Sequence, residues 1–128
     1  MNKTPATQKL TELESVIMDA VWELGEATVR DVQEHLKAAR PMARNTALTM
    51  MGILRDKGFL RSVREGRTDL YRPTVSREQV SGGLLRDVMN RFFSGSAHAL
   101  VSQLLDCEDL DPEEIKAIRR ELNRRLND

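Results

Sequence analysis

The chain has 128 residues and a mass of 14.6 kDa, and its 20 basic and 20 acidic side chains give a net charge of zero and a pI near 6.8. This length supports one compact domain, or one domain with a small appendage, and excludes a larger multidomain assembly. Hydrophobic residues make up 40% of the chain and aromatic residues only 4%, so a helical core is feasible, whereas a disordered chain and an aromatic stacking platform for single-stranded nucleic acid are excluded.

Two helix starts lie near the N-terminus. Residues 1–9 are expected to form a flexible tail ahead of them. Thr11 and Glu14 have the spacing of a capping box, and apolar residues then recur at helical intervals as far as Gly25, which predicts a first helix. Thr28 provides a similar cap for a second, shorter helix.

A proline separates the second helix from a third, which is predicted over residues 43–57 and ends at Gly58. After Gly58 the apolar period changes from helical to alternating. This pattern predicts a hairpin with strands at 60–64 and 68–72, joined by a turn in which Gly66 can adopt a positive φ. Three helices followed by a hairpin have the layout of a winged helix-turn-helix domain.

The composition changes near residue 76, which predicts a winged helix-turn-helix domain at 10–75 and a helical region at 76–128. The predicted fold class is therefore mainly α with a small β-hairpin wing. Apolar residues recur at helical spacing on three segments of the helical region. The residues that the last of these helices is expected to bury are Ile115, Ile118, Leu122 and Leu126.

The helical region is expected to pair with a second copy of the chain. Its three helices can form only a small core of their own, and the apolar stripe around Phe92 and Phe93 is wider than one neighbouring helix can cover. A second chain would cover the stripe, so we interpret this region as a dimerisation region. The residues expected at the homodimer interface are Leu84, Leu85, Val88, Phe92, Phe93, Leu100, Val101, Leu104, Ile118 and Leu122.

Basic side chains are concentrated in the middle of the chain. Residues 37–72 carry nine basic and three acidic side chains, whereas the segments before and after them have net charges of −4 and −2. A local positive region on a neutral protein suits contact with a polyanion. Charge alone is equally consistent with a solvated face.

The third helix is predicted to have two distinct faces. The residues expected to face the core are Ala47, Met50, Met51 and Leu54. The opposite face carries Asn45, Thr49, Gly52 and Asp56. Asn, Thr and Gly are not strong helix formers, so this face has little reason to exist for stability, and it fits insertion into the DNA major groove. The alternative is that Asn45 and Thr46 only cap the helix.

Specific DNA contacts follow from this placement. The residues expected to contact bases are Arg44, Asn45, Thr46 and Thr49, and those expected to contact the DNA backbone or the minor groove are Thr28, Arg61, Arg64 and Arg67. The alternative role of the hairpin arginines is to protect an exposed strand edge with charge.

A series of short motifs runs in order through residues 10–126. The motifs are Leu10-Thr11-Glu12-Leu13-Glu14, Val21-Trp22, Ala27-Thr28-Val29-Arg30-Asp31-Val32, Asn45-Thr46, Leu54, Lys57-Gly58-Phe59-Leu60, Glu65-Gly66-Arg67 and Tyr71. Together they resemble the penicillinase repressor family, the BlaI, MecI and CopY group. The resemblance implies an N-terminal winged helix, a C-terminal three-helix dimerisation region, and homodimers that repress genes for antibiotic or metal resistance by binding dyad operators. It places the recognition helix at 43–57 and the wing at 61–72.

The resemblance also implies a way to relieve repression. In the β-lactam branch of the family, a membrane sensor of the BlaR/MecR type acts indirectly, through a zinc-protease pathway that cuts an Asn-Phe bond in the dimerisation region. The matching bond here is Gln103-Leu104, which departs from that residue pair. Copper-responsive members carry paired Cys-x-Cys motifs, which the single Cys107 cannot supply. We interpret Cys107 as an ordinary surface or interface thiol.

These observations predict a cytoplasmic transcriptional repressor that binds a double-stranded palindromic operator as a homodimer, with two recognition helices in successive major grooves about 34 Å apart. The sequence has no nucleophile–base pair, phosphate-binding glycine loop or metal-ligand spacing, so we expect no enzyme, no metal and no cofactor. It has no apolar run near the roughly 20 residues of a membrane span, so no direct membrane binding is expected. Two alternatives remain: a winged-helix module that binds protein instead of DNA, and a regulator that binds a small ligand directly. Salt-dependent affinity for duplex DNA would separate the first alternative from a repressor.

Overall fold

The structure is a computed structural model that describes residues 9–107 and 109–128. The chain divides into two compact units, one that reaches Leu85 and one from Arg86 to Asp128. Apart from Lys9, the tail predicted at residues 1–9 lies outside the described residues. Among the described residues, no helix is both long enough and apolar enough to cross a membrane.

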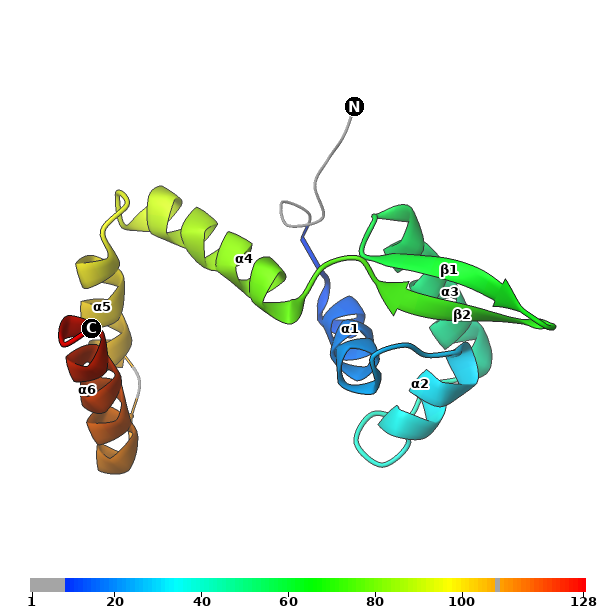
Figure 1. The fold of residues 1–128 in the computed structure, drawn as a ribbon, viewed down its shortest axis with the longest axis horizontal. Helices are drawn as coiled ribbons and strands as arrows, with labels where there is room; N and C mark the ends of the chain where they lie inside the picture. The colour runs from blue at the N-terminus through cyan, green and yellow to red at the C-terminus, as the bar shows by residue number, and fades with distance from the viewer. Residues whose placement is uncertain (1–8, 108) are drawn as a thin grey trace. The chain divides into compact units, whose positions relative to one another are not determined.

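The first helix, α1 (Glu12–Leu24), begins and ends at the residues that the sequence indicates (Figure 1). Thr11 Oγ1 accepts a hydrogen bond from the Glu14 backbone N–H at 3.2 Å, and the Glu14 carboxylate accepts one from the Thr11 N–H at 2.8 Å. The helix ends at Gly25, whose φ of 85° is a conformation that glycine adopts without steric cost. The predicted capping box is confirmed.

The second and third helices, α2 (Val29–Leu36) and α3 (Arg44–Asp56), also lie where they were predicted. Thr28 caps α2 through a reciprocal pair of hydrogen bonds with Asp31. The cap residue of α3 is Ala43, which has no side-chain oxygen, so the first turn of α3 presents backbone N–H groups without a side-chain cap.

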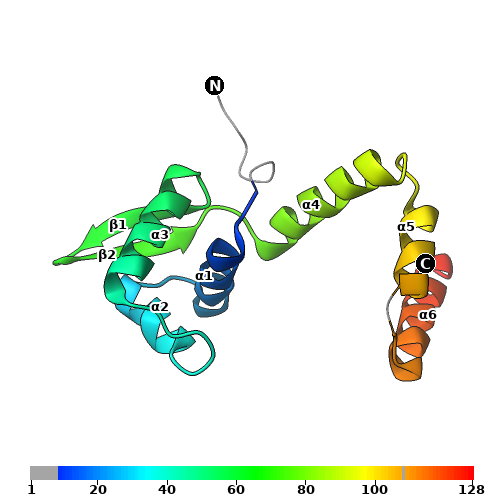
Figure 2. The same cartoon turned by 180° about the vertical axis from the view of Figure 1, so that it is seen from behind.

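A two-stranded antiparallel hairpin follows α3. Strand β1 (Leu60–Glu65) pairs with β2 (Thr68–Pro73) and leaves Gly66 and Arg67 as a two-residue turn. Gly66 has a φ of 63°, which is why glycine is needed there. Each predicted strand is lengthened by one residue, and Figure 2 shows the tip of this wing projecting past α3.

A second, very short pairing joins the wing to the loop between α1 and α2. The Ala27 N–H donates to the Tyr71 carbonyl at 2.9 Å, and the Tyr71 N–H donates to the Ala27 carbonyl at 2.8 Å. No local sequence signal predicts this bridge, because its two residues are far apart in the chain. The bridge fixes β2 to the loop between α1 and α2, and so holds the wing at a set position beside the helices.

The core of the first unit lies between α1, α2, α3 and the hairpin. Its largest fully buried side chains are Tyr71, Phe59, Ile17, Met18, Met51, Leu54, Leu60, Val21 and Val32. On α3, Ala47, Met51 and Leu54 are buried as predicted, whereas Met50 is only partly buried at the edge of the core.

Three helices complete the chain: α4 (Arg77–Phe92), α5 (Ala97–Cys107) and α6 (Pro112–Leu126). The start of α4 belongs to the first unit, where Val80 joins the core. Of the described residues from Arg86 to Asp128, none is buried.

The predicted burial of apolar residues on the last helix is wrong for a single chain. Ile118 is only half-buried, and Ile115, Leu122 and Leu126 are exposed, Leu126 by 81%. The physical reason is size, because a unit of about 40 residues is too small to enclose a core without further support.

Candidate nucleic-acid interface

The outer face of α3, defined by Asn45, Thr49, Gly52 and Asp56, is turned away from the core. The core residues of the same helix pack against α1, α2 and β1, which fixes the helix along its buried side. Asn45, Thr46 and Thr49 are all exposed. A rigid helix therefore displays three small polar side chains to solvent.

Asn45 and Thr46 do not cap α3. The cap position belongs to Ala43, and both polar residues lie inside the first turn of the helix. The interpretation that they only cap the helix is therefore wrong. Capping therefore does not explain why Asn45 and Thr46 lie on the exposed face of α3.

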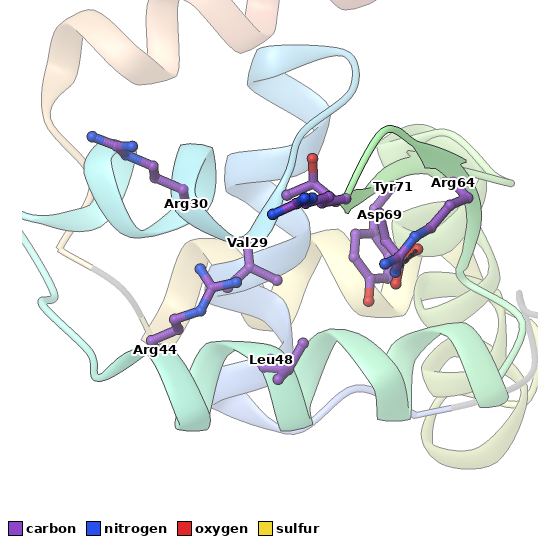
Figure 3. Close-up of a pocket in the computed structure, with 9 residues that line it drawn as sticks. Val29, Arg30, Arg44, Leu48, Arg64, Asp69 and Tyr71 are labelled. Atoms are coloured by element: carbon purple, nitrogen blue, oxygen red, sulfur yellow. Dashed lines mark hydrogen bonds and ion pairs between the residues drawn. The ribbon is translucent and has the colours of Figure 1, made fainter.

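Three arginines that were expected to contact DNA line one cavity. Arg44 comes from α3, Arg64 from β1 and Arg67 from the turn of the wing, and together they border a cavity of about 130 Å³. Figure 3 shows Arg44 extending from α3 toward Val29 at the start of α2, while Arg64 lies on the wing side near Asp69. The full lining consists of Val29, Arg30, Arg44, Leu48, Arg64, Arg67, Thr68, Asp69 and Tyr71.

One acidic side chain lies among these cations. Arg64 Nη1 is 3.4 Å from Asp69 Oδ1, and the Arg64 side chain is 66% exposed. An exposed pair of this kind contributes at most about 1 kcal/mol, so Arg64 can exchange Asp69 for a stronger anion such as a phosphate.

Two of the four residues expected to contact the DNA backbone or the minor groove lie outside this cavity. Arg61 is paired across the sheet with Arg72 and lies on the opposite face of β1 from Arg64, because neighbouring strand residues alternate between faces. Thr28 is half-buried, and its hydroxyl accepts the capping hydrogen bond from Asp31. The structure therefore groups Arg44, Arg64 and Arg67 but not the other two.

Two of the lining residues that were not predicted as contacts, Arg30 and Leu48, come from the helices. Arg30, in the first turn of α2, lines this cavity and, together with Arg44, also a second one of about 360 Å³. Leu48 lies one turn after Arg44 on the same flank of α3. The i, i+4 spacing from Arg44 would have indicated Leu48, whereas no local signal places Arg30 beside α3.

A buried ion pair holds the far end of α3. Lys57 Nζ donates to Glu14 Oε1 at 2.8 Å, and the Glu14 side chain is only 3% exposed. Burial alone would raise the pKa of the Glu14 carboxyl, but the Lys57 ammonium and the Thr11 hydrogen bonds outweigh burial and place that pKa below its ordinary value of 4.5. This pair joins the C-terminal end of α3 to the start of α1.

The first unit contains three helices and a hairpin wing, with an exposed polar face on α3 and an arginine-lined cavity beside that face. These features define a winged helix-turn-helix protein of the DNA-binding class. The family model described as "Penicillinase repressor" matches residues 10–124. The chain belongs to the penicillinase repressor family, which confirms the expected resemblance and places the chain among transcriptional repressors instead of enzymes.

Individual relatives agree with this assignment. The transcriptional regulator BlaI of Mycobacterium tuberculosis is 33% identical over 116 residues, which cover 89% of this chain and 83% of that protein. The penicillinase repressor of Bacillus licheniformis is 25% identical over 127 residues, covering 99% and 97% of the two chains. The solution structure of the DNA-binding domain of the repressor BlaI has a TM-score of 0.52 at 25% identity and covers 62% of this chain and 93% of that domain. This likeness confirms the predicted fold class.

Proposed function

We propose that the chain represses transcription as a homodimer on a palindromic operator, with α3 of each copy in one major groove. The observation that carries this proposal is the exposed polar face of α3 beside a cavity that arginines from α2, α3 and the wing surround. The major groove admits one α-helix, and the flanking phosphates attract guanidinium groups.

The proposed contacts divide into two kinds. Asn45 is suited to adenine, because its amide can donate and accept at once, and Thr46 and Thr49 can each donate one hydrogen bond or place a methyl group against a base. Arg44 lies at the same end of the helix and joins this base-contacting set.

The backbone-contacting set would hold the register of the complex. Arg64 and Arg67 flank the cavity on the wing side and would bind phosphates. Arg61 would act from the other face of the wing, and Thr28 from the N-cap position of α2.

The second unit supports the homodimer. Phe92 is 74% exposed, and it borders an apolar cavity of about 510 Å³ together with Val88, Phe93, Leu100, Gln103 and Leu104. None of the described residues of this unit is buried. An apolar surface of this kind therefore needs an apolar partner surface to cover it. A second copy of the same unit supplies one and would create the two-fold symmetry that a palindromic operator requires.

Relief of repression would act on this same surface. The Gln103-Leu104 bond lies inside α5, and both side chains border the apolar cavity. A protease controlled by a sensor of the BlaR/MecR type would cut this bond only after α5 opens locally, which a loosened dimer favours. In an intact dimer, binding of one copy to its half-site raises the local concentration of the second copy at the other half-site. Cutting or loosening the dimer removes this effect and so weakens binding to the operator.

The test compares Asn45→Ala with Arg67→Ala on a duplex selected from a random pool by the chain itself. Asn45→Ala should lose about 1–3 kcal/mol of discrimination at one base pair in each half-site. Arg67→Ala should weaken binding to all sequences and reduce the slope of log affinity against log salt by about 1. Equal losses for both variants on every sequence would contradict the division of contacts, and a chain without salt-dependent duplex affinity would be a protein-interaction module instead.

A further inference from the structure

One apolar side chain of α3 is not used by the core. Leu48 is 44% exposed, although Ala47 beside it and Met51 on the next turn are fully buried. Its side chain borders the arginine-lined cavity, where Val29 and Tyr71 form the remaining apolar lining. Figure 3 shows Leu48 on α3, on the side of the helix that faces this cavity.

The surroundings of Leu48 restrict what it can contact. Arg30, Arg44 and Arg64 surround the same cavity, so a docked ligand has to bring negative charge to its rim. A DNA duplex does so with its phosphates and presents base edges between them. In the major groove, the apolar group on a base edge is the C5-methyl of thymine.

The next turn of the helix leaves room for such a base. A Cβ atom at Gly52 would meet only an Arg55 side-chain nitrogen, at 3.9 Å, and the helical backbone there does not require glycine. Gly52 lies at i+4 from Leu48, so the surface next to the Leu48 side chain is free of a competing side chain.

We propose that Leu48 contacts the C5-methyl group of one thymine in each operator half-site and thereby specifies thymine at that position. This inference rests on the proposed function, because it needs α3 in the major groove. It adds an apolar contact to the polar base contacts of Asn45 and Thr49.

Replacement of thymine by uracil tests the contact, because it removes this methyl group and leaves the hydrogen-bonding pattern of the base unchanged. The full chain is titrated with its selected duplex, in which each thymine is replaced in turn by uracil. Two symmetry-related thymines, one in each half-site, should be sensitive to this replacement. At either of them, a single uracil should lower the affinity of the wild type about fourfold, which corresponds to the loss of one buried methyl group. Leu48→Ala should bind the unmodified duplex more weakly and show no further loss at those positions.

Ile53→Ala is the matched control, because Ile53 is an exposed aliphatic residue of α3 that does not border the cavity. It should keep the wild-type pattern of uracil effects. Circular dichroism is used to verify that each variant is folded before titration. A Leu48→Ala chain that still discriminates uracil, or a wild type that tolerates uracil at every position, overturns the inference while leaving the proposed function intact. A wild type that binds no duplex overturns both.

Discussion

At the scale of single residues, Gly52 combines poor helix propensity with no structural need for glycine. It lies inside α3 with helical backbone, and a Cβ atom would meet no atom outside the local helix backbone closer than 3.9 Å. Gly52→Ala should therefore raise the free energy of unfolding by about 0.5–1 kcal/mol. The same methyl group should weaken duplex binding by roughly the 1–3 kcal/mol that an extra methylene costs in a close-packed contact. Thermal unfolding and duplex titration measure the two effects.

Gly82 offers a matched control in α4. A Cβ atom there meets nothing within 4 Å, so Gly82→Ala should stabilise the chain by a similar amount and leave duplex affinity unchanged. Equal duplex affinity of Gly52→Ala and the wild type would mean that DNA does not approach this face of α3 closely.

Residue roles set by local spacing could be predicted from the sequence, and those set by distant partners could not. The capping boxes at Thr11 and Thr28 depend on residues three positions apart, and both are present. Arg61 was grouped with Arg64 by sequence proximity, but strand alternation puts the two on opposite faces of the hairpin. Arg30 joins the site only because α2 packs against α3.

At the scale of elements, the position of α3 depends on the ion pair between Lys57 and Glu14. Replacement of the ammonium in Lys57→Met keeps the aliphatic part of the side chain but leaves a buried carboxylate without its cation. We expect a loss of about 1–3 kcal/mol in the free energy of unfolding at neutral pH, measured by urea denaturation. Arg40→Met, which removes the exposed partner of Glu12, should cost about 1 kcal/mol or less.

The same pair predicts a pH dependence with a defined sign. The pKa of Glu14 in the folded chain lies below its ordinary value of 4.5, because the favourable hydrogen bonds and charge of Lys57 outweigh burial. Its stabilising contribution is therefore complete above about pH 4.5 and is lost as the pH falls through the lowered pKa. The stability advantage of the wild type over Lys57→Met should shrink as the pH is lowered below 4.5. A difference that stays constant down to the pH at which the wild type itself unfolds in acid would contradict this linkage.

The elements of the first unit were predicted to within about one residue, except for the bridge between Ala27 and Tyr71. Helices and hairpins carry their signals in consecutive residues, whereas this bridge joins two positions far apart in the chain. A second such link is the hydrogen bond from Trp22 Nε1 to the Val75 carbonyl at 2.8 Å, with Arg77 lying 5.5 Å from the Trp22 ring centroid. Both links position the segment that leads into α4, and neither has a local sequence signal.

At the scale of the whole molecule, the two units differ in how their apolar residues are used. The first unit encloses a continuous core, while the described part of the second unit has no buried residue. The width of the apolar stripe near Phe92 predicted a partner chain. It did not predict that Ile115 and Leu122 would stay exposed in one chain, because periodicity identifies an apolar face but not what covers it.

Phe92→Glu tests the proposed dimer, since a carboxylate at the centre of an apolar interface would be buried without a partner. Sedimentation should show a dimer for the wild type and a monomer for the variant, and affinity for a full palindrome should fall about a hundredfold. Affinity for a single half-site should stay unchanged, because Phe92 is separate from the core of the first unit. Leu24→Glu, which adds the same charge at an exposed leucine of the first unit, should remain a dimer. If Phe92→Glu also sediments as a dimer, a surface other than the apolar cavity joins the two copies.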